Sequence, residues 1–365
     1  MTSRSLPISV AVLVPIAVML VSHFADADTS PGTWDLARDP AQRERWKLHV
    51  RVETLLHAPV SEDAQPIDAV RNAEIRLELA RELLEQADAE HSPDVRLRFD
   101  IGIVYERLAD SQERDDMHRR AAEVLSSALE AAPEHPAAVT ALQYLGYAYA
   151  HLDRPRDELD VWRRYIPKLT DDRSRVVDTM NMGEAEMRLG RVDDALETFR
   201  DVLRLCGQLP NTSTPNSTYV LTLWDLAVAL DRSGDPRAAV ETAAKASAIV
   251  TIGSSQLPMS GRSIIAQDPA VFFVPAWERE WYLALASSAA ARDATDVRDA
   301  AAMWADAEHH WDSYVQGAAA GGGRDPWLAI ARARRDHTAA LRKDAENRAT
   351  KMPRRAPARP TWLDD

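Results

Sequence analysis

The sequence predicts an all-α protein, built as a solenoid of antiparallel helix pairs with capping helices at its ends. In the segment 179–203, apolar residues recur at steps of three and four along two successive stretches that Gly190 separates. Comparable stretches lie on both sides of this segment, with a small residue at each equivalent place. A single helix pair cannot bury both of its faces, so a series of pairs predicts a stack in which each pair covers the next.

The central unit shows how each helix is specified. Gly183 lies on the apolar stripe of the first helix and lets a neighbouring helix approach its backbone closely. Gly190 ends that helix, and Asp193 places a negative charge where the second helix begins. In the second helix, Ala195 is the small counterpart of Gly183, and Phe199 is the large side chain expected between the two helices.

This unit resembles the tetratricopeptide repeat, in which two small residues, a glycine and an aromatic residue occupy fixed positions. Those positions fall here on Gly183, Ala195, Gly190 and Phe199. Glu186 departs from the family, which usually has an aromatic residue at that place. The resemblance implies a right-handed superhelix whose first helices line a concave surface, and a protein that acts by presenting this surface to other proteins.

Four further units are predicted, two on each side of the central one. Upstream, the stretches around Gly146 and Gly102 repeat the pattern, although Glu158 replaces the small residue of the second helix in the Gly146 unit. The wide separation of Gly102 from Ala121 predicts a longer inter-helix loop in the first unit. Downstream, Ala227 marks a fourth unit, and a looser fifth unit spans 277–315. The array is therefore expected to be degenerate, with connections of unequal length.

The rest of the chain is divided around this array. Helices predicted at 42–57 and 67–89 precede it and one at 326–347 follows it, as caps for the open ends of the stack. In chain order, we expect a signal peptide at 1–27, a linker and helix at 28–65, the repeat array at 66–316 with insertions at 205–218 and 251–275, a hinge and C-terminal helix at 317–348, and a Pro/Arg-rich tail at 349–365.

The N-terminal segment has the features of a secretory signal. An apolar run at 6–21 follows Arg4 and precedes the small-x-small sequence at 25–27. The run is shorter than the ~20 residues that span a bilayer as a helix, so we predict cleavage after Ala27 and a periplasmic or secreted protein. The alternative is an uncleaved segment anchored in the inner membrane, which is the only membrane contact expected. The excess of Arg over Lys is typical of a bacterium with a GC-rich genome.

The charge balance restricts the classes of partner. With 57 acidic and 44 basic residues, the net charge is −13. This argues against a nucleic-acid-binding protein, because phosphate binding needs a concentrated basic surface, and it favours a protein or peptide partner with basic groups. Cys206 is the only cysteine, so no intrachain disulfide can form, and we expect it to be buried as a small apolar residue.

The family register assigns candidate binding residues to the concave surface. Its inward-facing positions carry Phe99, Tyr147, Met180, Glu184 and Trp224. Such a surface suits an apolar peptide or helix face, because aromatic and methionine side chains supply much of the contact energy in interfaces. Since the repeats are imperfect, the alternative is that these residues are rotated into the core.

Another inward-facing position carries one basic residue in each of the first four units. These residues are Arg107, His151, Arg188 and Arg232. Their regularity suggests a basic ladder that binds an acidic ligand strand. The alternative is structural, because each residue lies near a helix C-terminus, where a positive charge complements the helix dipole.

The insertion at 251–275 contains an apolar run, although a connection exposed to water is usually polar. Val271, Phe272, Phe273 and Val274 follow one another there. We expect either an ordered excursion that tucks Phe272 and Phe273 against neighbouring helices, or a lid over the groove that meets a partner.

No recognised catalytic or cofactor-binding motif occurs in the chain, so we predict neither an enzyme nor a cofactor. Asp306 and His310 have the spacing of a chelating pair, and His309 lies beside them, which leaves a metal-binding or enzymatic site in the 281–315 helices as an alternative. The leading hypothesis is an exported scaffold of the bacterial cell envelope that binds other proteins. A membrane-anchored envelope assembly factor with the same scaffold chemistry is the second hypothesis.

Overall fold

The computed structural model describes residues 31–58, 66–209, 213–253, 257–268, 271–322 and 325–352. Within these residues the secondary structure is helical apart from one short antiparallel hairpin, so the predicted all-α class is confirmed. The predicted signal peptide at 1–27 lies outside the described residues. In the part of the chain that the structure describes, no helix is both long and apolar enough to cross a membrane.

The described residues contain five antiparallel helix pairs, one for each predicted unit. The pairs are α5 (Val95–Gln112) with α6 (Asp115–Ala131), α7 (Ala138–His151) with α8 (Pro155–Tyr165), α9 (Asp172–Arg188) with α10 (Val192–Cys206), α11 (Ser213–Arg232) with α12 (Pro236–Ala248), and α14 (Glu278–Asp293) with α15 (Val297–Ala320). The flanking helices are α2 (Thr33–Arg38), α3 (Pro40–Leu56) and α4 (Pro66–Gln86) before the pairs, and α16 (Leu328–Thr350) after them. Short 3₁₀ turns, η3 (Ala89–His91) and η4 (Ile166–Lys168), precede α5 and follow α8.

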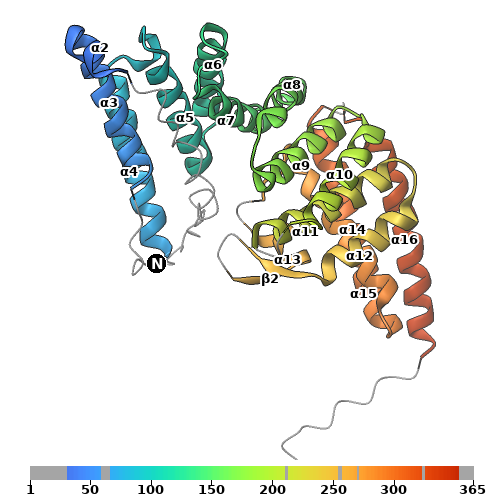
Figure 1. The fold of residues 1–365 in the computed structure, drawn as a ribbon. Helices are drawn as coiled ribbons and strands as arrows, with labels where there is room; N and C mark the ends of the chain where they lie inside the picture. The colour runs from blue at the N-terminus through green and yellow to red at the C-terminus, as the bar shows by residue number, and fades with distance from the viewer. Residues whose placement is uncertain are drawn as a thin grey trace, which may run out of the picture.

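The pairs follow one another along an arch, with α2–α4 at one end and α16 at the other (Figure 1). Each helix of the pairs packs against the next, and the first helices of neighbouring pairs also touch: α5 meets α7, α9 meets α11, and α11 meets α14. Because the first helices approach each other more closely than the second helices do, they lie on the inner side of the curve. The architecture is a helical solenoid of antiparallel helix pairs.

The turn inside each of the first four pairs has the same geometry. A residue with a left-handed backbone follows the first helix, at Glu113, Asp153, Gly190 and Gly234. The next amide donates to a carbonyl five residues earlier, as the amide of Arg191 does to the Glu186 carbonyl at 2.9 Å. Only two of the four left-handed positions are glycine, so the sequence indicates this turn clearly in the third and fourth units alone.

The close approach predicted at the small residue of each unit is present in the first three pairs. In the third pair, a methyl group added at Gly183 would lie 2.5 Å from the Phe199 ring, so the two helices pack this closely only because the residue is glycine. The first two pairs repeat the contact with Gly102 against Leu125 and Gly146 against Trp162. In each of the first three pairs, a glycine of the first helix therefore packs against a large side chain of the second helix.

Two predicted connections are shorter than expected. α5 ends at Gln112 and α6 begins at Asp115, so the extra residues of the first unit lengthen its helices instead of forming a longer loop. The predicted insertion at 205–218 is also mostly helical, because α10 ends at Cys206 and α11 begins at Ser213. Polar composition suggested a loop there, but Cys206 near its start and Thr218 at its end are helical and buried.

The predicted hinge beginning at 317 is likewise helical in its first part, because α15 continues to Ala320. Gly317 and Gly321 face the indole ring of Trp277, and any side chain at either position would collide with that ring. These glycines therefore serve close packing and not flexibility. The predicted tail begins inside α16, which ends at Thr350, and its residues from 353 lie outside the described part of the chain.

The predicted insertion at 251–275 is an ordered excursion. β1 (Val250–Ile252) pairs with β2 (Pro258–Ser260), and α13 (Gly261–Gln267) follows β2 directly. Gly261 lies against the carbonyl of Ala246, so no side chain fits there and α13 docks tightly beside α12. Residues 271–277, here called the strap, then lead back to α14.

Buried apolar residues form three clusters along the stack. The first lies among α3–α6, the second among α5–α8, and the third extends from α9 to α16. The junction between the second and third clusters is polar. There, the fully buried carboxyl group of Asp178 on α9 accepts hydrogen bonds from Tyr147 Oη at 3.1 Å and Gln143 Nε2 at 3.4 Å, both on α7.

Replacing Asp178 with asparagine is expected to change how stability depends on pH. Burial raises the pKa of Asp178 to about 7, although the bonds from Tyr147, Gln143 and Tyr165 lower it. Between about pH 4 and pH 7 the folded chain therefore holds a proton here that the unfolded chain has released, and the free energy of unfolding falls as pH rises. Because Asp178→Asn removes this contribution, its free energy of unfolding should fall less steeply between pH 5 and 7, by about 1.4 kcal/mol per pH unit. Urea unfolding at several pH values measures both slopes, and equal slopes would contradict the expectation.

Candidate functional site

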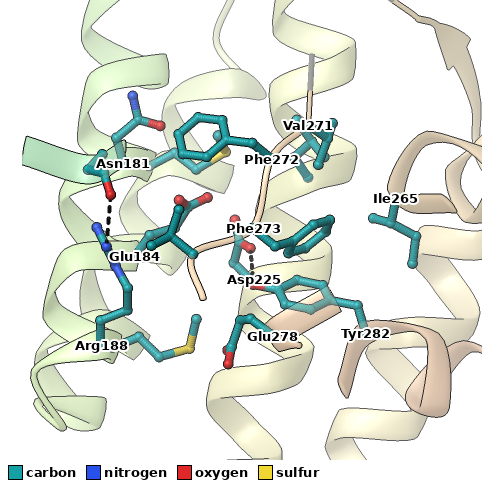
Figure 2. A pocket seen from close by; sticks show the side chains of 15 residues that line it. Asn181, Glu184, Arg188, Asp225, Ile265, Val271, Phe272, Phe273, Glu278 and Tyr282 are labelled. Carbon is teal, nitrogen blue, oxygen red and sulfur yellow. Dashed lines mark hydrogen bonds between the residues drawn. The ribbon is translucent and has the colours of Figure 1, made fainter. Parts of the chain in front are cut away.

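A pocket opens on the inner side of the stack, where the strap crosses the first helices of neighbouring pairs (Figure 2). Its walls come from the end of α7, from α9, α11, α13 and α14, and from the strap. The cavity volume is about 120 Å³, enough for several water molecules or the end of one long side chain. Among the candidate binding residues predicted from the sequence, those that line it are Met180, Glu184, Arg188, Phe272 and Phe273.

The strap supplies an aromatic wall that reaches from the fifth pair back to the second. The Phe272 ring stacks on His151 at the end of α7, with ring centroids 4.1 Å apart and an interplanar angle of 16°. Phe273 packs edge to face on Tyr282 of α14 at a centroid distance of 5.1 Å. Phe273 is half-buried, whereas Phe272 is still 48% exposed. The strap is therefore an ordered excursion tucked against helices, and it also lies over the pocket. That it meets a partner there stays a prediction.

Two carboxyl groups that form no ion pair with any of the described residues face each other inside the pocket. Figure 2 shows Glu184 of α9 and Asp225 of α11 converging below the strap. Asp225 accepts a hydrogen bond of 2.9 Å from the Tyr282 hydroxyl, and its second oxygen is buried with no partner among the described residues. Burial raises the pKa of Asp225 to about 7. Burial, together with the nearby Asp225, raises the pKa of Glu184 well above its usual range.

The arginines near the pocket are already neutralised by other acids. Arg188 is bonded to the buried carboxylate of Glu158 and also reaches the Ala150 carbonyl at 3.4 Å. Arg232 is bonded to Glu278 and is buried. Neither guanidinium makes an ion pair with Glu184 or Asp225, so the pocket keeps an excess of acidic groups.

The predicted basic ladder is not a continuous surface. Arg188 and Arg232 are engaged in the ion pairs just described, and Arg107 lines a separate small cavity beside α3. His151 is covered by Phe272. Burial, with His118 and Arg188 nearby, lowers the pKa of His151 to about 3, so its ring is neutral at pH 7. His151, Arg188 and Arg232 lie in the last turns of their helices as the register implied, whereas Arg107 does not, because α5 continues to Gln112. The acids Glu158 and Glu278 of neighbouring helices bind Arg188 and Arg232 internally.

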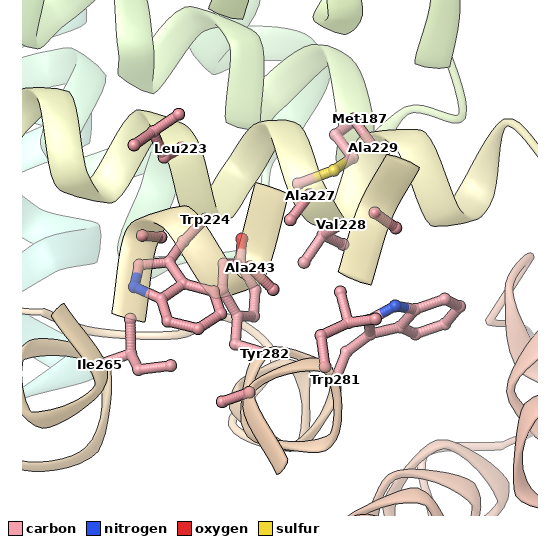
Figure 3. Packing of buried hydrophobic residues seen from close by; sticks show 14 of the residues in the cluster. Met187, Leu223, Trp224, Ala227, Val228, Ala229, Ala243, Ile265, Trp281 and Tyr282 are labelled. Carbon is pink, nitrogen blue, oxygen red and sulfur yellow. The ribbon is translucent and has the colours of Figure 1, made fainter. Parts of the chain in front are cut away.

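Three of the predicted groove residues do not line the pocket. Phe99 is fully buried in the second core cluster, and Trp224 is fully buried in the third, where it packs near Ile265 (Figure 3). Tyr147 is half-buried and donates its hydroxyl to Asp178. The alternative, that these residues are rotated into the core, is therefore correct for Phe99 and Trp224. In these degenerate repeats, the helix faces that carry the two side chains are turned toward neighbouring helices.

Sequence reasoning missed Asp225, Glu278 and Tyr282, which supply the acidic and phenolic side of the pocket. Asp225 carried a usable signal, because it is a lone charge inside the otherwise apolar run of α11. Glu278 and Tyr282 carried no such signal in the sequence. Both lie on the helix that follows the strap, and only the docking of that helix against α11 brings them to the pocket.

The alternative metal site in the 281–315 helices is not assembled. Asp306 accepts hydrogen bonds from Arg262 and Ser287, and His310 Nδ1 lies 2.7 Å from Glu280. His309 is exposed. The groups of three metal-ligating side chains that the described residues do form are elsewhere in the fold.

Comparisons with known proteins add little to this picture. No protein-family model matches the chain, and no curated protein matches it. One similar solved structure is a signal-transduction ATPase with numerous domains from Pyrococcus horikoshii that has a tetratricopeptide repeat sensor, at 14% identity and a TM-score of 0.44, covering 87% of this chain and 48% of that one. Another is a Rap protein complexed with competence and sporulation factor, at 12% identity and a TM-score of 0.40, covering 86% of this chain and 96% of that one. The chain thus spans about half the length of the ATPase.

Proposed function

We propose that this protein is a non-enzymatic interaction scaffold that holds a segment of a protein partner in the pocket under the strap. The observation that supports this most strongly is the pair of carboxyl groups, Glu184 and Asp225, which line the cavity and form no ion pair among the described residues. Asp225 Oδ2 is buried there without a hydrogen-bond partner, and a buried acid of this kind is costly unless a partner meets it. A bound segment would supply that partner.

The chemistry of the walls defines the partner segment. One side of the pocket is apolar, with Val271, Phe272 and Phe273 of the strap, and the other is acidic. A peptide with apolar side chains and one Lys or Arg matches both sides, because its cation would bind Glu184 and Asp225 in a partly desolvated place. The net charge of −13 favours the approach of such a basic segment.

The stack also suits this role mechanically. The helix pairs are held by glycine contacts and buried ion pairs, so the pocket is formed before a ligand arrives. A preformed surface loses little conformational entropy on binding, which is how helical repeat proteins hold extended ligands.

A photo-crosslinking amino acid at position 272 tests the proposal in the native envelope. Phe272 is 48% exposed beside the pocket, and Ile75 on α4 is 50% exposed far from it, so position 75 is a matched control. We expect an adduct from position 272 that position 75 does not give, and a captured peptide with apolar residues around a Lys or Arg. Equal capture from both positions, or a captured peptide without a basic residue, would contradict the proposal.

The captured segment then allows a direct binding measurement. Glu184→Gln combined with Asp225→Asn should weaken its binding by about ten- to a hundredfold, because each lost charged hydrogen bond contributes roughly 1.5–3 kcal/mol and part is retained by the amides. Glu197→Gln, an exposed acid on the outer helix α10, should leave the affinity unchanged. Fluorescence polarisation with the labelled peptide gives all three values, and a loss shared by the Glu197 variant would point to a general charge effect.

The cellular place of action is proposed from the N-terminal sequence. An exported protein of the bacterial envelope is supported by the apolar run at 6–21 and the small-x-small sequence before Asp28. The intact mass of the exported protein decides between a mature chain that begins at Asp28 and an anchored assembly factor that keeps the segment. Recovery of the whole chain in the cytoplasm would exclude both.

A further inference from the structure

A second group of ionisable side chains lies next to the pocket, between the first and second helix pairs. Glu106 of α5, His118 of α6 and His151 of α7 each place one possible ligand atom within 4.8 Å of the others. Glu106 and His118 are 2% exposed, and His151 is half-buried. Three helices therefore bring two imidazoles and a carboxyl group to one buried point.

The hydrogen bonds of this group leave one buried oxygen unsatisfied. His118 Nδ1 lies 2.9 Å from Glu106 Oε2, whereas Glu106 Oε1 is buried and has no hydrogen-bond partner among the described residues. The rings of His118 and His151 stack at a centroid distance of 4.2 Å and an angle of 11°. A buried carboxyl oxygen without a donor or cation is unfavourable, so this one points to a group that the three side chains would hold together.

We propose that Glu106, His118 and His151 bind a divalent transition-metal ion, and that zinc suits them best. Neutral imidazole nitrogens and a carboxylate oxygen form a ligand set that zinc commonly takes. Zinc bonds of ~2.0–2.2 Å in a tetrahedral site place the ligand atoms roughly 3.3 Å apart. On binding, the His118 and His151 rings would therefore leave their stacked arrangement, and the three ligand atoms would close in from separations of up to 4.8 Å. Asp110 Oδ1 lies 3.7 Å from His151 Nε2 and outside the group of three, so it would meet the ion through a bound water molecule.

The surroundings fit a site that is closed on one side and open on the other. On the pocket side, the Phe272 ring covers His151. Asp110 is partly exposed and offers the ion a polar path from solvent. A bound ion would link α5, α6 and α7, and would thereby join two helix pairs.

The other three-residue group among the described residues is a weaker candidate. In it, His49 Nδ1 lies 2.7 Å from Asp100 Oδ2, and Glu53 Oε2 lies 3.1 Å from His57 Nδ1. No unpartnered buried oxygen occurs among His49, Glu53 and Asp100. These side chains satisfy one another or their neighbours without an ion.

Zinc titration of the full-length chain, purified without a histidine tag and freed of metal with a chelator, tests the proposal. Calorimetry with ZnCl₂ should give one ion per chain, and Co²⁺ in place of zinc should give the strong visible absorption of a tetrahedral nitrogen–oxygen site. Glu106→Gln and His118→Gln should each weaken zinc binding at least ~100-fold, because each removes a ligand. His310→Gln and His49→Gln, matched histidine changes outside the group, should leave it unchanged.

The wild-type titration keeps the proposal open to refutation even where a variant folds poorly. Absence of stoichiometric zinc binding by the wild-type chain would overturn it. So would zinc binding that Glu106→Gln and His118→Gln leave intact while circular dichroism shows their helices unchanged, or binding that His49→Gln abolishes. None of these measurements involves the pocket ligand, so the outcome is independent of the proposed scaffold function.

Discussion

Replacing Arg232 with methionine is expected to lower the free energy of unfolding by about 3–5 kcal/mol. The Arg232 side chain is 1% exposed and is bonded to Glu278. Its guanidinium carbon also lies 4.5 Å from the ring centroid of Trp281 and 5.1 Å from that of Trp327. Methionine fills much of the same space but leaves Glu278 buried without its counter-charge, and this unpaired charge accounts for most of the expected loss. Urea unfolding at pH 7, followed by circular dichroism, measures the change.

Two further variants separate the buried charge from a general effect of losing an arginine. Arg237 is 85% exposed and lies 3.0 Å from Glu241, so Arg237→Met should change the free energy of unfolding by less than about 1 kcal/mol. The double variant Arg232→Met with Glu278→Met should recover much of the stability, because no buried charge remains. Similar losses in Arg232→Met and Arg237→Met would show that the Arg232 pair is not desolvated.

Replacing Trp224 with alanine is expected to lower the free energy of unfolding by about 3–5 kcal/mol as well. Trp224 is fully buried and packs near Ile265 of α13 (Figure 3). Its indole Nε1 donates a hydrogen bond of 2.9 Å to the Gly261 carbonyl, which ties the insertion to α11. Alanine would leave a cavity and an unpaired carbonyl, so this variant tests the docking of the insertion and is unsuitable as a test of partner binding.

The controls for this prediction separate packing from hydrogen bonding. Trp224→Phe keeps most of the ring and should cost about 1–3 kcal/mol, chiefly through the unpaired Gly261 carbonyl. Trp34→Ala removes an exposed indole from α2 and should change stability by less than about 0.5 kcal/mol. If urea unfolding gave Trp224→Ala as small a loss in the free energy of unfolding as Trp34→Ala, the Trp224 indole could not be part of the core.

The fold was predictable because its signals are local. The third unit shows them all: Gly183 receives Phe199, and Gly190 adopts the left-handed turn that ends α9. Where the same turn is made by Glu113 or Asp153, the sequence carries no such mark. For this reason the prediction of a longer loop in the first unit was wrong. Nothing in the sequence showed that α5 would extend to Gln112.

The candidate site was only partly predictable. In a degenerate repeat, the direction in which a side chain points depends on how the neighbouring helix pair packs. Met180 and Glu184 face the pocket as the family register implies, while Trp224 at an equivalent position is turned into the core. Asp225 reaches the pocket although the register did not select it. A helix periodicity fixes which residues share a face, but the rotation of that face is set by packing.

The sequence by itself determined that this chain forms stacked helix pairs, since apolar spacing, small residues and helix ends act over a few turns of helix. Tertiary structure alone decided that Phe272 of the strap meets His151 of the second pair, and that Glu106, His118 and His151 meet across three helices. Phe272 and His151 are far apart in the sequence, and their contact depends on the curvature of the stack and on the path of the insertion. Glu106, His118 and His151 lie on three successive helices, and their meeting depends on how those helices are rotated against one another. No local pattern encodes either arrangement, because both arise from the packing of whole helices.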